Sequence, residues 1–295
     1  MTAANSTNGG MKPNRSVFVT RAPLRITVIA LCLVWSLPTL GILVSSFRDA
    51  RAIVSTGWWT ALLAPFQEDW TLINYEQVLG GANMANAFIN SLIVTIPATV
   101  IPITVAAFAA YAFAWMKFPL RGTLFLVVVA LLVVPLQMAL IPVQQFYSML
   151  GLNNTFISVW LAHTAFGLPL AIFLLYNFIS QLPGDLFETA SIDGATHFQM
   201  FTKVVLPLSV PALAAFAIFQ FLWVWNDLLV ALTYLGGLPD QSVMTLELSR
   251  LVGGRGQQWH LLTAGAFVTM LLPMVVFLAL QRYFVRGILS GSVKG

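Results

Sequence analysis

Residues 188–207 have the sequence ETASIDGATHFQMFTKVVLP, the longest stretch in the middle of the chain that is not simply apolar. The stretch carries charges of both signs, has Gly194 near its centre and ends at Pro207. Apolar runs long enough to cross a membrane lie on both sides, at 156–179 and 208–235. A short polar loop between two spans must face one side of the bilayer. We therefore interpret this loop as the surface through which a partner protein moves the rest of the chain.

The composition places the chain among membrane proteins. Of its 295 residues, 59% are hydrophobic and 8% are charged, whereas soluble domains contain about 25% charged residues. The single cysteine excludes an internal disulfide and a cysteine metal site. The sequence lacks the phosphate-binding loop GxxxxGK[ST], the zinc motif HExxH and the nucleophile elbow GxSxG. We therefore expect no catalytic residues, no bound cofactor, no metal site and no nucleic-acid partner.

Six apolar runs predict six transmembrane helices, at approximately 26–47, 87–115, 123–146, 156–180, 208–235 and 261–285. The first run extends roughly 33 Å as a helix, enough to cross a hydrocarbon core of about 30 Å. Helices and closed barrels are the structures that satisfy their backbone groups in lipid, and the alternating pattern of a barrel is absent. We predict an all-α polytopic membrane protein with a six-helix domain at 23–286, and with tails at 1–22 and 287–295.

The basic residues predict the orientation of the chain. If the N-terminus is cytoplasmic, ten of the 14 Lys and Arg residues fall on the cytoplasmic side and four fall outside. This bias agrees with the positive-inside rule. Both termini and the loop at 182–207 are therefore expected in the cytoplasm, and the long loop at 48–86 is expected outside. The aromatic residues of that outer loop fit either an interfacial belt or a docking surface for an external partner.

Asp227 is the only charged side chain placed well inside a predicted span. A carboxylate in hydrocarbon is costly, so it should face a wet cavity or a partner, unless it lies close enough to the outer headgroups. Sugars stack their apolar ring faces on aromatic rings and bond their hydroxyls to amides and carboxylates. Trp223, Asn226 and Asp227 are therefore candidates for a sugar pathway. Two polar residues of other spans are further candidates, although each could instead bond to a neighbouring helix: Gln137 and Asn90.

The spacing within 188–207 resembles the signature of the permease subunits of binding-protein-dependent ABC importers. That signature is E-A-A, three residues, G, nine residues, I-x-L-P. Here 188–190 correspond to E-A-A, Gly194 falls at the glycine position, and 204–207 complete the motif. The departures are Thr for the second residue and Val for Ile, and both are conservative in size.

Three further stretches resemble the carbohydrate branch of that family, specifically the second permease of maltose-type systems: NSLIVT from Asn90, WNDLLVAL from Trp225 and QRYFVRGILSGSVKG from Gln281. The resemblance covers most of residues 25–295. It implies the type I ABC importer permease fold and a location in the bacterial inner membrane. It also implies a heterodimer with a second permease, two cytoplasmic ATPase subunits that bind ATP and Mg²⁺, and an extracytoplasmic sugar-binding protein.

The resemblance further implies that the loop forms a short helix that docks on the ATPase. The residues expected to couple the two proteins are Glu188, Thr189, Ala190, Asp193, Gly194, Ala195 and Pro207. The C-terminal tail is expected to reach the same interface through Ser292, Lys294 and Gly295. The predicted function is import of a sugar, an α-glucoside or a small oligosaccharide. The alternatives are an ABC permease for a non-sugar solute and, less well supported, an ion-coupled carrier.

Overall fold

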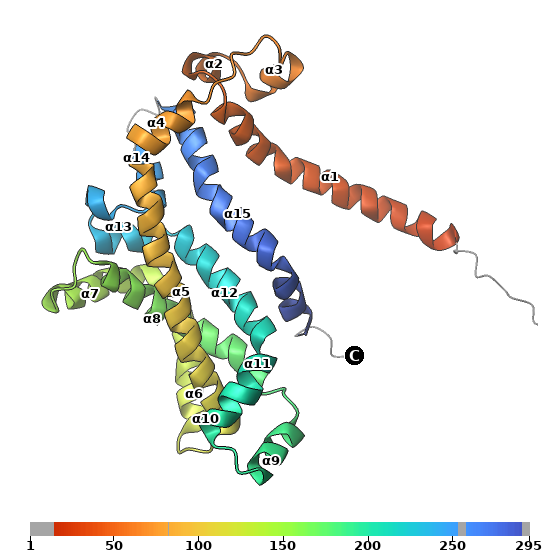
Figure 1. Cartoon of the computed structure of the whole chain (residues 1–295), viewed down its shortest axis with the longest axis vertical. Coiled ribbons are helices and arrows are strands. Elements are labelled where there is room, and N and C mark those ends of the chain that lie inside the picture. The colour runs from red at the N-terminus through yellow and green to blue at the C-terminus, as the bar shows by residue number, and fades with distance from the viewer. Residues whose placement is uncertain (1–14, 82, 253–257, 291–295) are drawn as a thin grey trace, which may run out of the picture.

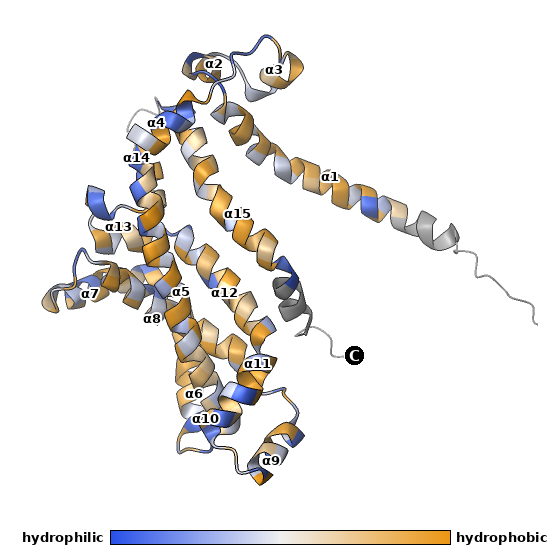
Figure 2. Cartoon of the chain, viewed as in Figure 1, coloured by the Kyte–Doolittle hydropathy of each residue, from blue (hydrophilic) through white to orange (hydrophobic). Residues whose placement is uncertain are grey.

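The computed structural model describes residues 15–81, 83–252 and 258–290, which form helices and, within those ranges, a single isolated bridge between Arg48 and Trp70. Four helices are long and apolar enough to cross a membrane (Figures 1 and 2): α1 (Arg15–Ser46), α5 (Met84–Trp115), α8 (Phe156–Ile179) and α15 (Trp259–Ser290). Two bent pairs raise the number of candidate spans to six.

The first bent pair lies where the third span was predicted. Here α6 (Arg121–Ala130) and the 3₁₀ turn η1 (Leu131–Val133) meet α7 (Leu136–Met149) at an angle of 103°. Val134 is extended because it precedes Pro135, which disfavours helical geometry in the residue before it and has no N–H to donate. The prediction of one continuous helix over 123–146 is therefore wrong.

The predicted fifth span is also divided. α12 (Val210–Trp225) ends at Asn226, and a separate helix, α13 (Leu229–Leu235), follows it. The stretch His197–Leu208 meets α12 at 72°, which makes the second bent pair. The continuous helix predicted at 208–235 is therefore wrong in extent.

Both terminal helices are longer than the sequence predicted. α1 begins at Arg15, inside the segment expected to be a tail (1–22), and α15 continues to Ser290, inside the segment expected to be the C-terminal tail (287–295).

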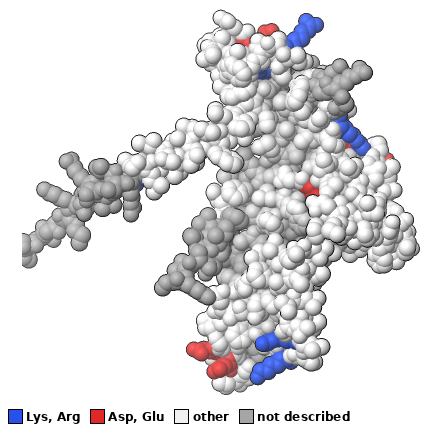
Figure 3. Space-filling view, turned by 180° about the vertical axis from the view of Figure 1, so that it is seen from behind, with Lys and Arg blue, Asp and Glu red and all other residues white. Residues whose placement is uncertain are grey.

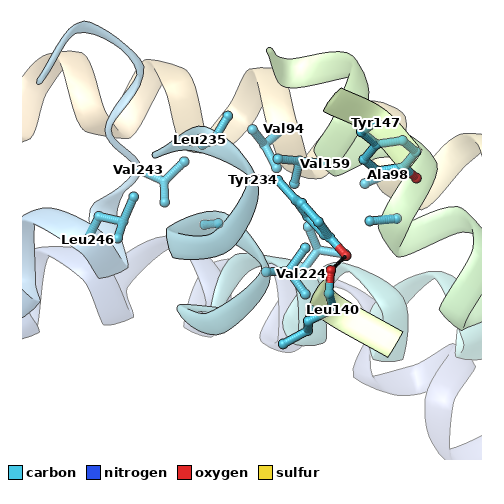
Figure 4. Close-up of a cluster of buried hydrophobic side chains, with 13 residues drawn as sticks. Val94, Ala98, Leu140, Tyr147, Val159, Val224, Tyr234, Leu235, Val243 and Leu246 are labelled. Carbon is cyan, nitrogen blue, oxygen red and sulfur yellow. Dashed lines mark hydrogen bonds between the residues drawn. The ribbon is translucent and has the colours of Figure 1, made fainter. Parts of the chain in front are cut away.

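The central packing is between α5 and α8, which run side by side. Alanines on the inner face of α5 are buried and let α8 approach closely. A second cluster, drawn in Figure 4, joins α5, α7, α8, α12 and α13 to α14 (Met244–Val252). In it the hydroxyl of Tyr234 donates a hydrogen bond to the carbonyl of Leu140 at 3.1 Å. This bond ties α13 to α7. It therefore joins the helix that follows the end of α12 to the helix that follows the break after α6.

One end of the molecule is closed by a helical cap comprising α2 (Ala50–Ser55), α3 (Trp58–Leu63) and α4 (Ile73–Gly81) (Figure 1). Its centre is Arg48, which is buried and pairs with Glu68 at 2.6 Å. Asn74 donates hydrogen bonds to the carbonyls of Ser46 and Arg48, which attach α4 to the end of α1. The cap and the loop at 182–207 thus lie at opposite ends of the bundle.

Candidate functional site

The signature glycine ends a helix. α9 (Gly184–Ile192) stops in a Schellman motif: the N–H of Gly194 bonds to the carbonyl of Ser191 at 3.1 Å, and the N–H of Ala195 bonds to that of Ala190 at 2.9 Å. Gly194 has φ +75°, a left-handed conformation that side chains other than those of Asn and Asp rarely tolerate. A Cβ at Gly194 would meet no atom within 4 Å. The backbone of the motif therefore favours glycine over most residues, while the space around it stays open.

A new helix begins directly after this turn. Thr196 and Gln199 form a capping box, in which each side chain accepts a hydrogen bond from the other residue's backbone N–H. α10 (His197–Met200) then continues through a π-helical turn, η2 (Phe201–Val205), into α11 (Leu206–Leu208). Pro207 cannot donate the next backbone bond, and the 72° bend follows two residues later. We call residues 184–208 the α9–α11 unit.

Aromatic contacts seat one side of the α9–α11 unit on the bundle. The ring of Phe187 stacks on that of Trp115, the last residue of α5, with centroids 3.7 Å apart. The indole N–H of Trp115 donates to the carbonyl of Ile179, the last residue of α8. Phe201 stacks on Phe108 of α5, with a centroid distance of 4.4 Å. The unit is therefore fixed to α5, and the end of α5 is itself bonded to the end of α8.

The other side of the α9–α11 unit is open. Glu188, Thr189, Asp193, Gly194 and Pro207 are exposed, and Ala190 and Ala195 are partly buried. Two apolar side chains lie among them: Ile192 is 86% exposed and Phe198 is 66% exposed. Charged side chains also gather at this end of the molecule (Figure 3). Apolar side chains exposed among charged residues are suited to bind a protein partner.

The structure divides the five predicted pathway residues among different settings. Asn90 is buried and donates two hydrogen bonds, to the carbonyls of Asp240 and Ser242. Gln137 is exposed on α7, and Asn226 is exposed and bonds to the carbonyl of Leu222 in its own helix. The bonds of Asn90 fasten the loop that follows α13, and the bond of Asn226 lies at the end of α12.

Asp227 starts a helix. One of its carboxylate oxygens accepts hydrogen bonds from the N–H groups of Val230 and Ala231, at 2.9 and 3.1 Å, and so satisfies the first turn of α13. The same oxygen lies 3.8 Å from Nε2 of the buried His163. Asp227 and His163 line a cavity of about 10 Å³, which is room for roughly one water molecule.

The fifth residue, Trp223, lines a much larger cavity of about 470 Å³ at the break between α6 and α7. Leu132 and Val134 of the break form one wall, and α8 and α12 form the others. Gln220 of α12 is fully buried at the cavity wall, and its Oε1 finds no hydrogen-bond donor among the described residues. Gln220 was not among the residues predicted from the sequence, although an amide inside the apolar run 208–225 is a detectable signal. The exposed Ile192 was not predicted either.

The cap interaction gives a stability prediction for Asp227. We expect Asp227→Ala to lower the midpoint of thermal unfolding of the purified permease by roughly 2–4 °C, because an N-cap contributes about 1 kcal/mol. Asp227→Asn keeps an oxygen acceptor and should unfold within about 1 °C of the wild type. Asn226→Ala, at the exposed neighbouring position, is the control. Unchanged unfolding of Asp227→Ala combined with loss of transport would instead assign Asp227 to the substrate pathway.

The chain matches known proteins over most of its length. Residues 102–290 match the family described as binding-protein-dependent transport system inner membrane component. The chain is 56% identical to the osmoprotective compounds uptake permease protein GgtD of Synechocystis, over 99% of both chains. It is 42% identical to the alpha-glucoside transport system permease protein AglG of Rhizobium meliloti, over 97% of this chain and 100% of that one.

Two solved structures share the fold. One is a bacterial ABC transporter that imports the acidic polysaccharide alginate: the TM-score is 0.71 at 18% identity, over 93% of this chain and 100% of that one. The other is the alginate transporter in complex with a periplasmic protein that holds an alginate pentasaccharide; the TM-score is 0.63 at 15% identity, over 88% and 93% of the two chains. These matches confirm the predicted all-α permease fold.

Proposed function

The chain belongs to the family of binding-protein-dependent transport system inner membrane components, and on this premise we propose that it is a permease subunit of an ATP-driven importer of small α-glucosides or short oligosaccharides. The subunit is not an enzyme, because ATP hydrolysis in these transporters belongs to a separate ATPase. In the proposed arrangement the six-helix domain at 23–286 forms half of the translocation pathway. A second, different permease completes it.

The substrate class is supported by two relatives and by the cavity. One relative is named for osmoprotective compounds and the other for α-glucosides. A neutral, highly soluble glucoside fits both names. Every residue that lines the 470 Å³ cavity is uncharged, whereas a polyamine or phosphate would need compensating charge in such a site. The cavity therefore favours a neutral solute over a charged one.

The observation that carries the proposal is the two-sided α9–α11 unit. Its inner side is stacked on α5, whose last residue bonds to the end of α8, and its outer side exposes Ile192 and Phe198 among charged residues. Its last helix leads directly into α12. We propose that the ATPase holds this outer side, with the coupling residues predicted from the sequence at the contact. Closure of the ATPases on ATP would then move α12 and alternate the access of the pathway.

The proposed assembly has two ATPase subunits, which bind ATP and Mg²⁺, on the side of the α9–α11 unit. An extracytoplasmic sugar-binding protein docks at the opposite end, where the α2–α4 cap lies. The bacterial inner membrane surrounds the bundle, with both termini in the cytoplasm. The expected tail contacts of Ser292, Lys294 and Gly295 lie outside the described residues.

Two alternatives have observations in their favour. The name of the relative that takes osmoprotective compounds also fits an ABC permease for a solute that is not a sugar. The buried pair of His163 and Asp227 is the feature that an ion-coupled carrier would use. Both of these groups are already engaged in the packing of α8 and α13, which favours the ATP-driven importer.

Transport in proteoliposomes tests the proposal. The complete system, with ATP inside the vesicles and the binding protein outside, is expected to take up at least one labelled α-glucoside from sucrose, maltose, trehalose and methyl α-glucoside. Vesicles whose ATPase cannot hydrolyse ATP are the control and should show no uptake above leakage. Uptake driven by an ion gradient without the ATPase would contradict the proposal, as would import of a zwitterionic osmoprotectant with no import of any glucoside.

A further inference from the structure

We propose that α3 and the turn after it, residues 58–66, bind lipid: they rest at the boundary between the headgroups and the acyl chains, beside the cap end of α1. We call these residues the α3 anchor. The inference goes beyond transport, because it assigns a membrane surface to one face of the α2–α4 cap. The charged residues that flank the anchor, such as Arg51 and Asp69, remain available to a partner in water.

The α3 anchor exposes a row of large apolar side chains. Trp59, Leu62, Leu63 and Phe66 have the spacing i, i+3, i+4 and i+7, which gathers residues on one side of a helix. Their exposed fractions range from 55% for Leu62 to 102% for Phe66. The sequence has no charged residue from 52 to 67. An exposed apolar row of this kind marks contact with a membrane or with a protein.

The opposite face of α3 packs against a membrane-spanning helix. Ala61 is fully buried, and the indole of Trp58 lies against Gly41 of α1, where a Cβ would be only 2.9 Å from Nε1 of the indole. The missing side chain of Gly41 lets the ring approach the backbone of α1 closely. Figure 1 shows α3 next to the cap end of α1. Both faces of α3 are therefore apolar, one covered by α1 and one open.

The contact with Gly41 sets the depth of the α3 anchor. A charge in hydrocarbon is costly, so the apolar core begins beyond Arg25. A core of about 30 Å takes roughly 20 helical residues, which brings its far edge to about residue 45, and any tilt of α1 moves that edge further along the helix. Gly41 therefore lies roughly 6 Å inside the edge. Interfacial helices bury their apolar faces to a similar depth, about 5–10 Å, and this agreement favours lipid as the occupant.

The rest of the cap holds the α3 anchor in this position. The indole N–H of Trp70 donates a hydrogen bond to the carbonyl of Pro65 at 2.8 Å, which fixes the turn that carries Phe66. Glu68 follows this turn and pairs with the buried Arg48, just beyond the end of α1. An anchor attached in this way sets the height of the whole cap above the bilayer. It thereby also sets the position of the surface that an external partner meets.

Fluorescence quenching tests the proposal in the complex of both permeases and both ATPases, reconstituted into nanodiscs without the binding protein. The other subunits carry no accessible cysteine, and in this subunit Cys32→Ser is combined with either Leu63→Cys or Phe66→Cys, each labelled with bimane. One quencher is a lipid brominated on its acyl chains, and the other is iodide in the water. At both positions the brominated lipid is expected to quench at least about threefold more strongly than iodide, because the labels lie among acyl chains.

Asp69→Cys, in the same Cys32→Ser background, is the matched control. Asp69 is exposed, lies three residues after Phe66 in the same cap, and carries a charge that belongs in water. Its label is expected to show the reverse order, with iodide quenching more strongly than the brominated lipid. The comparison therefore separates insertion of the apolar row from a general attraction of the label to lipid.

Two results would overturn the proposal. If iodide quenches the labels at 63 and 66 as strongly as the label at 69, the apolar row faces water. If neither quencher reaches positions 63 and 66, the second permease covers the row. The measurement involves no transport, so a failure of the proposed substrate or of the proposed coupling would leave this result unchanged.

Discussion

Replacing Gly194 by Asp is expected to reduce binding-protein-stimulated ATP hydrolysis of the reconstituted complex by about tenfold or more, while the complex still assembles. Asp tolerates the left-handed backbone at this position, and the space around the Cβ is open, so the subunit itself should fold normally. The new carboxylate would lie in the surface proposed to meet the ATPase. An unpaired charge buried there costs several kcal/mol, and each 1.4 kcal/mol is about tenfold in an equilibrium.

Gly151 provides a matched control for this substitution. It has φ +69°, a Cβ there would also meet no atom within 4 Å, and it lies in the turn between α7 and α8. Gly151→Asp is expected to leave stimulated hydrolysis within about twofold of the wild type. If both variants lose hydrolysis equally, the effect is a general one of charge. If neither does, residues 188–207 are a connecting loop and the proposed coupling is wrong.

Two phenylalanines of the α9–α11 unit should separate folding from coupling. Phe187 is buried against Trp115, so Phe187→Ala should destabilise the unit by about 3 kcal/mol and uncouple hydrolysis from uptake. Phe198 is exposed and stacks on no ring among the described residues, so Phe198→Ala should change stability by less than about 0.5 kcal/mol. It should nevertheless weaken binding of the ATPase about tenfold or more, as loss of a central apolar anchor does.

Thermal unfolding of the permease and titration of the ATPase onto permease-containing nanodiscs measure the two effects separately. Thr202→Ala, at a half-buried position of the same unit whose hydroxyl bonds within its own helix, serves as the control and should change neither quantity appreciably. The interpretation fails if Phe198→Ala binds the ATPase like the wild type. It also fails if Phe187→Ala unfolds and couples normally, because the stack on Trp115 would then not hold the unit in place.

The positions of the apolar runs could be read from the sequence, and the continuity of the helices within them could not. Length and hydropathy locate six apolar runs, but a window average does not register where backbone bonds are lost. Proline alone does not decide the matter: α5 stays continuous through Pro97 and Pro102, whereas the span with Pro135 turns by 103°. α5 is packed along its length by α8, and that packing compensates for the missing donors. Packing of this kind is not visible in the sequence.

The proposed coupling loop left a clearer signal in the sequence than the candidate pathway residues did. The spacing around Gly194 identified the loop, and the Schellman motif supplies a physical reason for its glycine. For Asp227, the rarity of a charge in an apolar run indicated a special position without distinguishing a helix cap from a pathway residue. Gln220 carries the same ambiguity, because only the three-dimensional arrangement shows that its nitrogen is bonded and its oxygen is not.

The 72° bend at Ser209 joins the α9–α11 unit and α12 as the two arms of a bent lever. Backbone bonds run on both sides of the pivot, from Ser209 to Val205 and from Leu213 to Ser209, so the two arms turn together. Gln220 lies about 16 Å along α12 from the pivot, so a rotation of about 10° would displace it by roughly 3 Å. Its 3.1 Å bond to Ala98 would not survive that displacement. A rotation of the α9–α11 unit would therefore release α12 from the contact with α5 that Gln220 makes.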